Sequence, residues 1–353
     1  MQGSEGEMLV KPIAVDMYCG CGAVTEGLKT SFRVVAAIDN DPTAAASYRA
    51  NHPNVKFFEK DIRELSPTAI RKVVGDRNID LLVVCAPCQP FSSQNSRKGE
   101  DDRVSLVLQA SRFAAVLKPR LIFFENVSGL LAPRHSELLR ELRIKLQSLG
   151  FSEWCGPIRV NAADYGVPQR RYRCVMMVAR KRVNLPHIPP ASTPENSRVT
   201  VREAIGDLAS LSSGEASSVD GLHFARKHRS IALQRFRHIA KDGGSRFDLP
   251  LELELECHKH HRGHPDVYGR MSWNEVAPTL TSGCTDATRG RFVHPEDDRA
   301  ITLREAARLQ TFPDHYIFEG NPQDIATQIG NAVPVDFVRV FGKTMCVSLR
   351  TGS

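Results

Sequence analysis

The sequence of 353 residues contains no apolar run close to the roughly 18 residues that a membrane-spanning helix needs. The segment Met1 to Val10 is polar and partly acidic, which is not the pattern of a signal peptide. Nine cysteines are present, an odd number without the spacing of a disulfide framework, so we expect reduced thiols in a cytoplasmic protein. Aromatic residues are few, at 7%, while 41% hydrophobic and 25% charged residues are ordinary for a globular chain. These absences exclude the membrane-spanning and disulfide-rich secreted classes.

Basic residues exceed acidic ones, and the net charge of +7 favours a polyanionic partner. The excess is concentrated between His223 and Arg246, where seven Lys and Arg residues face a single acid, Asp242. The seven are Arg226, Lys227, Arg229, Arg235, Arg237, Lys241 and Arg246. A charge run is commonly a solvated face, but its concentration in one segment favours contact with the phosphates of a nucleic acid.

The length predicts two lobes, because a single core stops growing at roughly 250–300 residues. From residue 13 to 125, short apolar runs alternate with helical segments, which predicts crossover units and a parallel sheet. Strands are expected over 13–18, 32–39, 55–58, 79–85, 121–124 and 174–179, with helices beginning near residues 42, 67 and 104. We therefore predict an α/β fold with a doubly wound, mostly parallel sheet.

The composition of the chain changes beyond Arg180. Residues 184 to 220 are rich in Pro, Ser and Gly, and the block 221–285 is basic and rich in His. Strict alternation over Leu251 to Glu256 predicts a half-exposed strand. The sequence Thr302-Leu-Arg-Glu305 is a capping box, which predicts a helix through Gln310.

A cysteine follows the fourth predicted strand, in the sequence Pro87-Cys88-Gln89-Pro90. In open α/β sheets, ligands bind at the carboxyl ends of the strands, so Cys88 is placed where a thiolate could attack a substrate. A half-buried structural cysteine is the alternative for this segment alone. A redox pair with Cys85 fits poorly, because Cys85 belongs to the strand, whereas a redox CxxC usually opens a helix.

The loop Cys19-Gly20-Cys21-Gly22 follows the first strand and precedes a helix. Glycines there allow a ligand close to the backbone, but Thr25 breaks the GxGxxG pattern of dinucleotide binding. Asp39 ends the next strand, where a carboxylate suits the hydroxyls of a ribose, and Asp61 ends the third, where it could accept from an adenine amino group. The pattern favours a nucleoside without pyrophosphate, with exposed loop acids as the alternative.

A carboxyl group and two arginines occupy comparable positions further along. Glu125 closes the strand 121–124, so it is expected at the same sheet edge as Cys88. Arg171 and Arg173 are two residues apart on an extended chain and so share one face. That face could bind a phosphate or orient the carboxyl of Glu125.

Metal binding is weakly supported. Cys19 and Cys21 lack a second cysteine pair, so a zinc site is a poor fit. The cluster Cys257 to His264 could bind a metal, but interleaved Lys259 and Arg262 favour a loop that faces nucleic acid or solvent. We expect no metal.

Six ordered motifs together are specific. They are Asp-x-Tyr-Cys-Gly-x-Gly from Asp16, Pro-Cys-Gln-Pro-Phe-Ser from Pro87, Glu-Asn-Val from Glu125, Gln-Arg-Arg-x-Arg from Gln169, Arg-Glu-Ala-Ala-Arg-Leu-Gln-x-Phe-Pro-Asp from Arg304, and Gly-Asn-Ala-Val-Pro from Gly330. In these motifs the chain resembles the DNA (cytosine-5) methyltransferase family over residues 10–345. One departure is Ala23, where the family commonly has a second glycine.

The resemblance implies S-adenosylmethionine as cofactor, double-stranded DNA as partner, and transfer of a methyl group to C5 of a flipped-out cytosine. Cys88 would be the nucleophile that adds to C6, Glu125 would hold N3 and the amino group, and Arg173, with Arg171 nearby, would orient that site. The implied cofactor-binding residues are Tyr18, Cys19, Gly20, Cys21, Gly22, Asp39, Asn40, Asp61, Ile62, Pro87, Asn331, Ala332 and Val333. The implied DNA-binding residues are Gln89, Ser92, Arg229, Arg235, Arg237, Thr279 and Thr281. The polar segment Ser93 to Arg103 resembles the family's cover over the flipped base.

The resemblance also implies two domains. Residues 9–184 with 318–353 would form the catalytic, S-adenosylmethionine-binding domain of the methyltransferase type, and residues 185–317 a smaller target-recognition domain. We expect a monomer from a bacterium or archaeon, acting with a cognate restriction endonuclease, in phage defence, or alone. The alternatives are an RNA methyltransferase of the tRNA-modifying branch, whose usual Cys-Phe-Thr element is absent, and a catalytically silent DNA-binding relative.

Overall fold

The computed structural model describes residues 10–87, 91, 102–258 and 265–351. Seven strands of these residues form one sheet in the order β3-β2-β1-β4-β5-β7-β6. Their bounds are β1 Ile13–Met17, β2 Arg33–Asp39, β3 Lys56–Glu59, β4 Leu81–Val84, β5 Leu121–Val127, β6 Phe151–Asn161 and β7 Tyr172–Arg180. The neighbours from β3 to β5 pair in parallel, and β7 is antiparallel to β5 and β6. The predicted fold class is confirmed.

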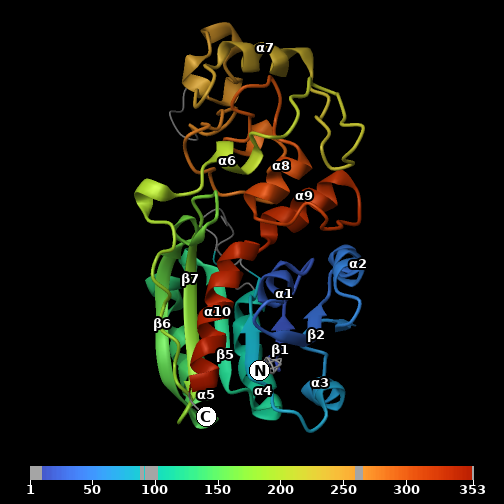
Figure 1. The fold of residues 1–353 in the computed structure, drawn as a ribbon. Helices are drawn as coiled ribbons and strands as arrows, with labels where there is room; N and C mark the ends of the chain where they lie inside the picture. The colour runs from blue at the N-terminus through green and yellow to red at the C-terminus, as the bar shows by residue number, and fades with distance from the viewer. Residues whose placement is uncertain (1–9, 88–90, 92–101, 259–264, 352–353) are drawn as a thin grey trace, which may run out of the picture.

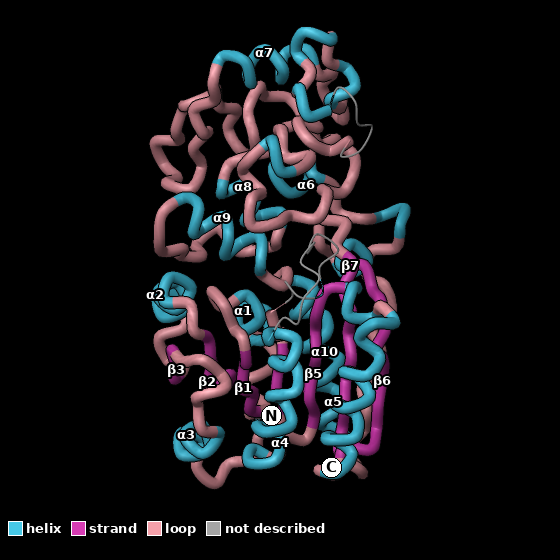
Figure 2. The backbone as a smooth tube through the Cα atoms, turned by 180° about the vertical axis from the view of Figure 1, so that it is seen from behind, coloured by secondary structure: helices cyan, strands magenta, loops and turns pink. Residues whose placement is uncertain are grey.

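Helices cover both faces of this sheet (Figures 1 and 2). One face carries α1 (Ala23–Leu28), α2 (Pro42–Asn51) and α10 (Val335–Thr351), and the other α3 (Pro67–Val74), α4 (Gln109–Leu117) and α5 (Ser136–Ser148). Because both faces are covered, the central strands are rich in apolar residues, as in β4, where every residue is apolar and buried. Among the described residues no helix has the length and apolar character to cross a membrane.

Local signals explain where the helices begin. Asp41 accepts hydrogen bonds from the N–H groups of Thr43 and Ala44 at the start of α2, and Pro42 occupies the first turn. The predicted capping box of Thr302 and Glu305 is present and opens α8, Leu303–Leu309. The starts of these two helices could be predicted from the sequence because each cap is made by residues at most three apart in the chain.

A second lobe lies beyond the sheet (Figure 1). It contains α6 (Val201–Ile205), α7 (Ser230–His238) and α8, joined mostly by irregular loops. One of its apolar clusters includes α8, α9 (Pro322–Asn331) and, from the sheet lobe, Cys21 and Ala23. The two lobes are therefore joined by a shared core beside the first loop. The domain boundaries expected from sequence stay a prediction.

The strand predicted over Leu251 to Glu256 is wrong. The segment forms two short 3₁₀ turns, Leu251–Leu253 and Glu256–His258, separated by Glu254 and Leu255. Alternation alone cannot make a strand, because a strand also needs a neighbour to pair its N–H and C=O groups. Leu253 is buried in the second lobe, whereas Leu251 is exposed.

The strand β5 is longer than predicted. It continues through Val127, because β7 pairs antiparallel with it as far as Val127 opposite Arg173. Glu125 therefore lies within β5 rather than after it. The pairing fixes the backbone on which this carboxyl group stands.

Candidate functional site

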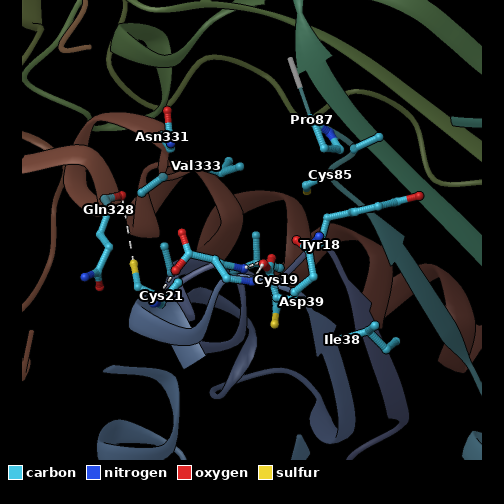
Figure 3. A pocket seen from close by; sticks show the side chains of 18 of the residues that line it. Tyr18, Cys19, Cys21, Ile38, Asp39, Cys85, Pro87, Gln328, Asn331 and Val333 are labelled. Carbon is cyan, nitrogen blue, oxygen red and sulfur yellow. Dashed lines mark hydrogen bonds between the residues drawn. The ribbon is translucent and has the colours of Figure 1, made fainter. Parts of the chain in front are cut away.

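A cavity of about 470 Å³ lies at the carboxyl ends of β1, β2 and β4. It is bounded by the loop after β1, the end of β2, the residues after β4, and the end of α9 (Figure 3). Fourteen residues that the sequence singled out line it: Tyr18, Cys19, Gly20, Cys21, Asp39, Asn40, Asp61, Ile62, Pro87, Glu125, Arg173, Asn331, Ala332 and Val333. The cavity volume is in the range of small-molecule sites.

The loop after β1 forms one wall of the cavity. The N–H of Gly20 donates to Asp39 Oδ2 at 2.8 Å, which ties this loop to the end of β2. Tyr18 has a left-handed backbone (φ 60°), and its hydroxyl donates to the carbonyl of Leu106 at 2.7 Å. Leu106 also lines the cavity. Sequence reasoning missed it, because a backbone contact 88 residues away leaves no local signal.

Two carboxyl groups stand near this loop in different environments. Asp39 faces the cavity, and burial raises its pKa, although its oxygens also accept from the N–H groups of Gly20 and Asp41. Asp16 is fully buried, and burial raises its pKa to about 7, against the lowering effect of a hydrogen bond from Thr25. Asp16 does not line the cavity, so of the two Asp39 is the carboxyl group available to a ligand.

Asp61 lines the cavity but already has a partner. The Arg63 guanidinium donates to both oxygens of Asp61, the closest approach being 2.6 Å, and this hydrogen bonding lowers the pKa of Asp61. Asp61 thus stays ionised, and it keeps lone pairs for a ligand's amino group. The Arg112 guanidinium from α4 binds the carbonyls of Ile62 and Leu65 and so fixes this wall.

Glu125 and Arg173 form a buried pair in the same cavity. Arg173 Nε lies 2.7 Å from Glu125 Oε1, and both side chains are more than nine-tenths buried. Burial raises the pKa of Glu125, while the charges of Arg173 and Arg171 act in the opposite direction. The pairing of β5 with β7 produces this contact. The Glu125–Arg173 pair presents to a substrate a carboxyl group with a raised pKa and a guanidinium held in place.

Arg171 and Gly22 were predicted at the site, but neither lines the cavity. The guanidinium of Arg171 donates to the carbonyls of Leu280, Gly330 and Ala332, at 2.8, 3.0 and 3.0 Å. Arg171 therefore braces β7 against α9 and the second lobe rather than facing a ligand. The sequence could not separate it from Arg173, because both belong to the same short basic motif.

The segment after β4 reaches the cavity through Cys85 and Pro87. Burial raises the pKa of the Cys85 thiol well above its ordinary value, and the nearby charge of Glu125 raises it further. Cys85 is therefore a poor nucleophile. Asn126 Nδ2 donates to the carbonyl of Ala86 at 3.0 Å and holds this segment to β5. Cys88, Gln89 and Ser92 lie outside the described residues.

The C-terminal part of α9 closes the cavity. Asn331, Ala332 and Val333 line it, and so does Gln328, which sequence reasoning missed. Gln328 Nε2 donates to the carbonyl of Glu319, and its Oε1 accepts from Ser47 in α2. Gln328 lies one helical turn before Asn331, and this spacing could have predicted that both side chains face the cavity.

The residues expected to contact DNA lie in the second lobe. Arg229, the residue before α7, and Arg237, on α7, are both exposed. Arg235 is engaged within the lobe: its Nε donates to the carbonyl of Leu253 at 2.9 Å, and its guanidinium lies over the Tyr268 ring. Thr279 Oγ1 donates to the carbonyl of Arg170, at the contact between the lobes. Thr281 is half-buried nearby.

No group of His, Cys, Asp and Glu suited to a metal ion is found among residues 10–87, 91, 102–258 and 265–351. Cys257 is exposed, and the histidines of the Cys257 to His264 cluster at positions 260, 261 and 264 lie outside these ranges.

Comparison with known proteins identifies relatives over nearly the whole chain. The model of the C-5 cytosine-specific DNA methylase family matches residues 13–346. Type II methylase M.HgiDII of Herpetosiphon aurantiacus is 40% identical over 338 residues, covering 94% of each chain. Type II methyltransferase M.XorII of Xanthomonas oryzae pv. oryzae is 32% identical over 370 residues, covering 97% of this chain and 86% of the other.

The fold also has a close counterpart among solved structures. A prophage-encoded DNA modification methyltransferase from E. coli superposes with a TM-score of 0.73 at 23% identity, covering 97% of this chain and 100% of that one. At this identity the likeness concerns the fold.

Proposed function

The chain belongs to the C-5 cytosine-specific DNA methylase family, and from this premise we propose how its residues carry out the reaction. It is a DNA cytosine-5 methyltransferase, and S-adenosylmethionine is the methyl donor. The proposal is that the cavity described above binds this cofactor, and that a cytosine flipped out of duplex DNA reaches the Glu125–Arg173 pair. The observation that carries it is a single cavity lined both by Asp39 and by this pair.

The chemistry of the lining suits S-adenosylmethionine. Asp39 presents a carboxylate for the two ribose hydroxyls, and Asp61 presents one for the adenine amino group. The apolar side chains of Ile62, Pro87 and Val333 can cover the uncharged parts of the molecule. The bound cofactor supplies an electrophilic methyl group.

In the proposed mechanism, the Cys88 thiolate adds to C6 of the cytosine. A C6–S bond forms, and the electrons of the C5–C6 double bond make C5 nucleophilic enough to accept the methyl group. The bond between this methyl group and the sulfonium sulfur would break, leaving S-adenosylhomocysteine. The C5 proton then passes to a water-derived base, the double bond re-forms, and the thiolate leaves. The fixed Pro87 before Cys88, and the hydrogen bond of Asn126 to Ala86, support the placement of this thiol.

Glu125 stabilises the adduct. Its raised pKa favours a protonated carboxyl that can donate to N3, while the other oxygen accepts from the amino group of the base. Arg173 holds this carboxyl in place through the 2.7 Å contact. Arg171 acts as a positioning residue, because its hydrogen bonds go to backbone carbonyls at the contact between the lobes.

The experiment that tests the proposed function is bisulfite sequencing of DNA from a host that expresses the protein. Cytosines protected in one recurring sequence are expected, and the same map gives the recognised sequence. A map indistinguishable from that of the host with an empty vector would contradict the proposal. Both relatives named above are Type II enzymes, and we propose that this chain likewise protects its target from a cognate restriction endonuclease.

Asp39→Ala should weaken binding of S-adenosylmethionine. The substitution removes an acceptor for two hydroxyls, so we expect a loss of about 1.5–3 kcal/mol, roughly ten- to a hundredfold in Kd. Isothermal titration calorimetry measures it directly.

Asp80→Ala is the matched control. Asp80 also accepts a backbone N–H, from Ile13 at 2.8 Å, but it lies at the opposite end of the sheet. We expect the affinity of the Asp80→Ala variant for S-adenosylmethionine to stay near the wild-type value. Equal affinities of the Asp39 variant and the wild type would show that Asp39 does not bind the ribose.

The exposed arginines of the second lobe should contribute to DNA affinity independently of sequence. Replacing Arg229 and Arg237 by Gln should weaken binding to cognate and unrelated duplexes alike. The slope of log affinity against log salt should flatten by about 0.9 for each lost phosphate contact. Arg235 is left unchanged, because its contacts with Leu253 and Tyr268 hold the lobe together.

The control for this variant removes two cations from the sheet lobe, Arg140 and Lys145, which lie on the exposed side of α5. Their replacement by Gln changes the net charge equally. If both double variants show the same salt slope, the effect is one of overall charge, and α7 does not contact phosphates.

A further inference from the structure

Two side chains that do not line the cavity hold the loop after β1. Tyr316 Oη donates to the carbonyl of Cys21 at 2.6 Å. His52 Nε2 lies 3.2 Å from the carbonyl of Gly22 and 3.2 Å from Tyr316 Oη. Both side chains are buried, Tyr316 to 3% exposure and His52 to 9%. Consecutive carbonyls of the loop thus each have a side-chain partner.

The donors and acceptors of this group are mutually consistent. Burial lowers the pKa of His52 and raises the pKa of Tyr316 well above its ordinary value, so the imidazole is neutral and the phenol keeps its proton. Since a carbonyl only accepts, His52 Nε2 must carry the hydrogen that faces Gly22. Tyr316 donates its proton to the carbonyl of Cys21, and its oxygen can accept only a share of the single Nε2 hydrogen that His52 directs at Gly22.

The contact leaves no spare room at Gly22. This residue has a left-handed backbone (φ 102°), and a Cβ placed on it would lie 2.7 Å from His52 Nε2 and 2.8 Å from Tyr316 Oη. Tyr316 is itself packed against the rings of Phe312 and Phe318, with centroids 4.8 and 5.3 Å away, and these two rings also contact each other. The loop therefore rests against a fixed surface. This also explains why Gly22 does not line the cavity.

The two side chains come from different parts of the chain. His52 follows α2 in the sheet lobe. Its backbone N–H donates to the carbonyl of Tyr48 and makes the last hydrogen bond of this helix. Tyr316 follows α8, and Arg308 of that helix binds Asp314 at 2.8 Å, two residues before Tyr316. Arg308 also pairs with Asp207, which follows α6 in the second lobe. Tyr316 is thus anchored outside the sheet lobe.

We propose that Tyr316 and His52 are positioning residues for cofactor binding. By fixing the carbonyls of Cys21 and Gly22, they set the peptide planes of the loop that carries Tyr18, Cys19 and Gly20, and with them the contact of Gly20 with Asp39. They act through this loop without touching the ligand. The inference rests on the proposed function, in which this cavity binds S-adenosylmethionine.

The test compares Tyr316→Phe with Tyr165→Phe. Tyr165 is also buried among aromatic rings, and its hydroxyl donates to a carbonyl, that of Pro189 at 3.2 Å, away from the cavity. Both variants should unfold at slightly lower temperature, because each loses one buried hydrogen bond. Calorimetry should show a Kd for S-adenosylmethionine about 5- to 20-fold weaker in the Tyr316 variant and unchanged in the Tyr165 variant.

A second pair of variants uses His52. His52→Gln keeps an N–H donor for Gly22, whereas His52→Leu removes it, so His52→Gln should bind S-adenosylmethionine several-fold more tightly than His52→Leu. This pair decides the matter if the Tyr316 variant does not fold. Wild-type affinity in Tyr316→Phe, or equal affinities in the two His52 variants, would overturn the inference. A wild-type protein that binds no S-adenosylmethionine would instead overturn the proposed function.

Discussion

Cys88→Ala should abolish methyl transfer while leaving DNA binding intact. Without the thiolate no C6–S bond forms, and C5 of cytosine stays a poor nucleophile. The expected loss in turnover is at least about 10⁴-fold, the scale seen when a covalent nucleophile is removed. Incorporation of labelled methyl groups into duplex DNA measures the loss, and gel-shift titration measures binding. Methylation at the wild-type rate would exclude the covalent mechanism.

Cys257→Ala is the control for this variant. Cys257 is exposed in the second lobe, so its replacement should leave turnover unchanged. A complementary trap uses duplex DNA with 5-fluorocytosine at the target position. Fluorine cannot leave C5 as a proton does, so wild-type protein should remain attached to this DNA through denaturing electrophoresis, and the Cys88 variant should not. A wild-type protein that methylates ordinary DNA yet gives no attached product would contradict thiolate addition.

Glu125→Gln should lower kcat by about two to three orders of magnitude, as for loss of a group that stabilises developing charge. The amide keeps the size of the side chain and one donor, but it cannot release a proton to N3. Binding of DNA and of S-adenosylmethionine should change little, because the interaction strengthens only in the adduct. Glu137→Gln on the exposed side of α5 is the control and should behave as wild type. Single-turnover kinetics under saturating conditions separate these effects.

The same residue predicts a pH dependence. The raised pKa of Glu125 keeps the carboxyl protonated to higher pH than an exposed glutamate, and its burial is the main cause. If the protonated form donates to N3, kcat should fall as pH rises through this pKa, and the Glu125→Gln variant should lack that decline. A decline of the same shape in both proteins would assign it to a group other than Glu125.

Much of the architecture was predictable because the signals were local. The apolar runs, the capping residues of α2 and α8, and the order of strands and helices gave the doubly wound sheet. The acids Asp39 and Asp61 were identified because parallel strands end at one edge, so residues at strand ends meet. The failure at Leu251 to Glu256 marks the limit of this reasoning. Its alternation was real, but no strand in the described part of the chain pairs with it.

The sequence by itself determined the fold class, the family and fourteen of the residues that line the cavity, since the alternating apolar runs, the ordered motifs and the acids at strand ends are all local signals. Only the tertiary structure separated Arg173, paired with Glu125, from Arg171, which braces the lobes. Only it brought Tyr316 and His52, 264 residues apart, to the same loop. These hydrogen bonds to backbone carbonyls form only when distant segments pack together. The spacing of residues along the chain therefore does not predict which buried carbonyl a distant side chain will bind.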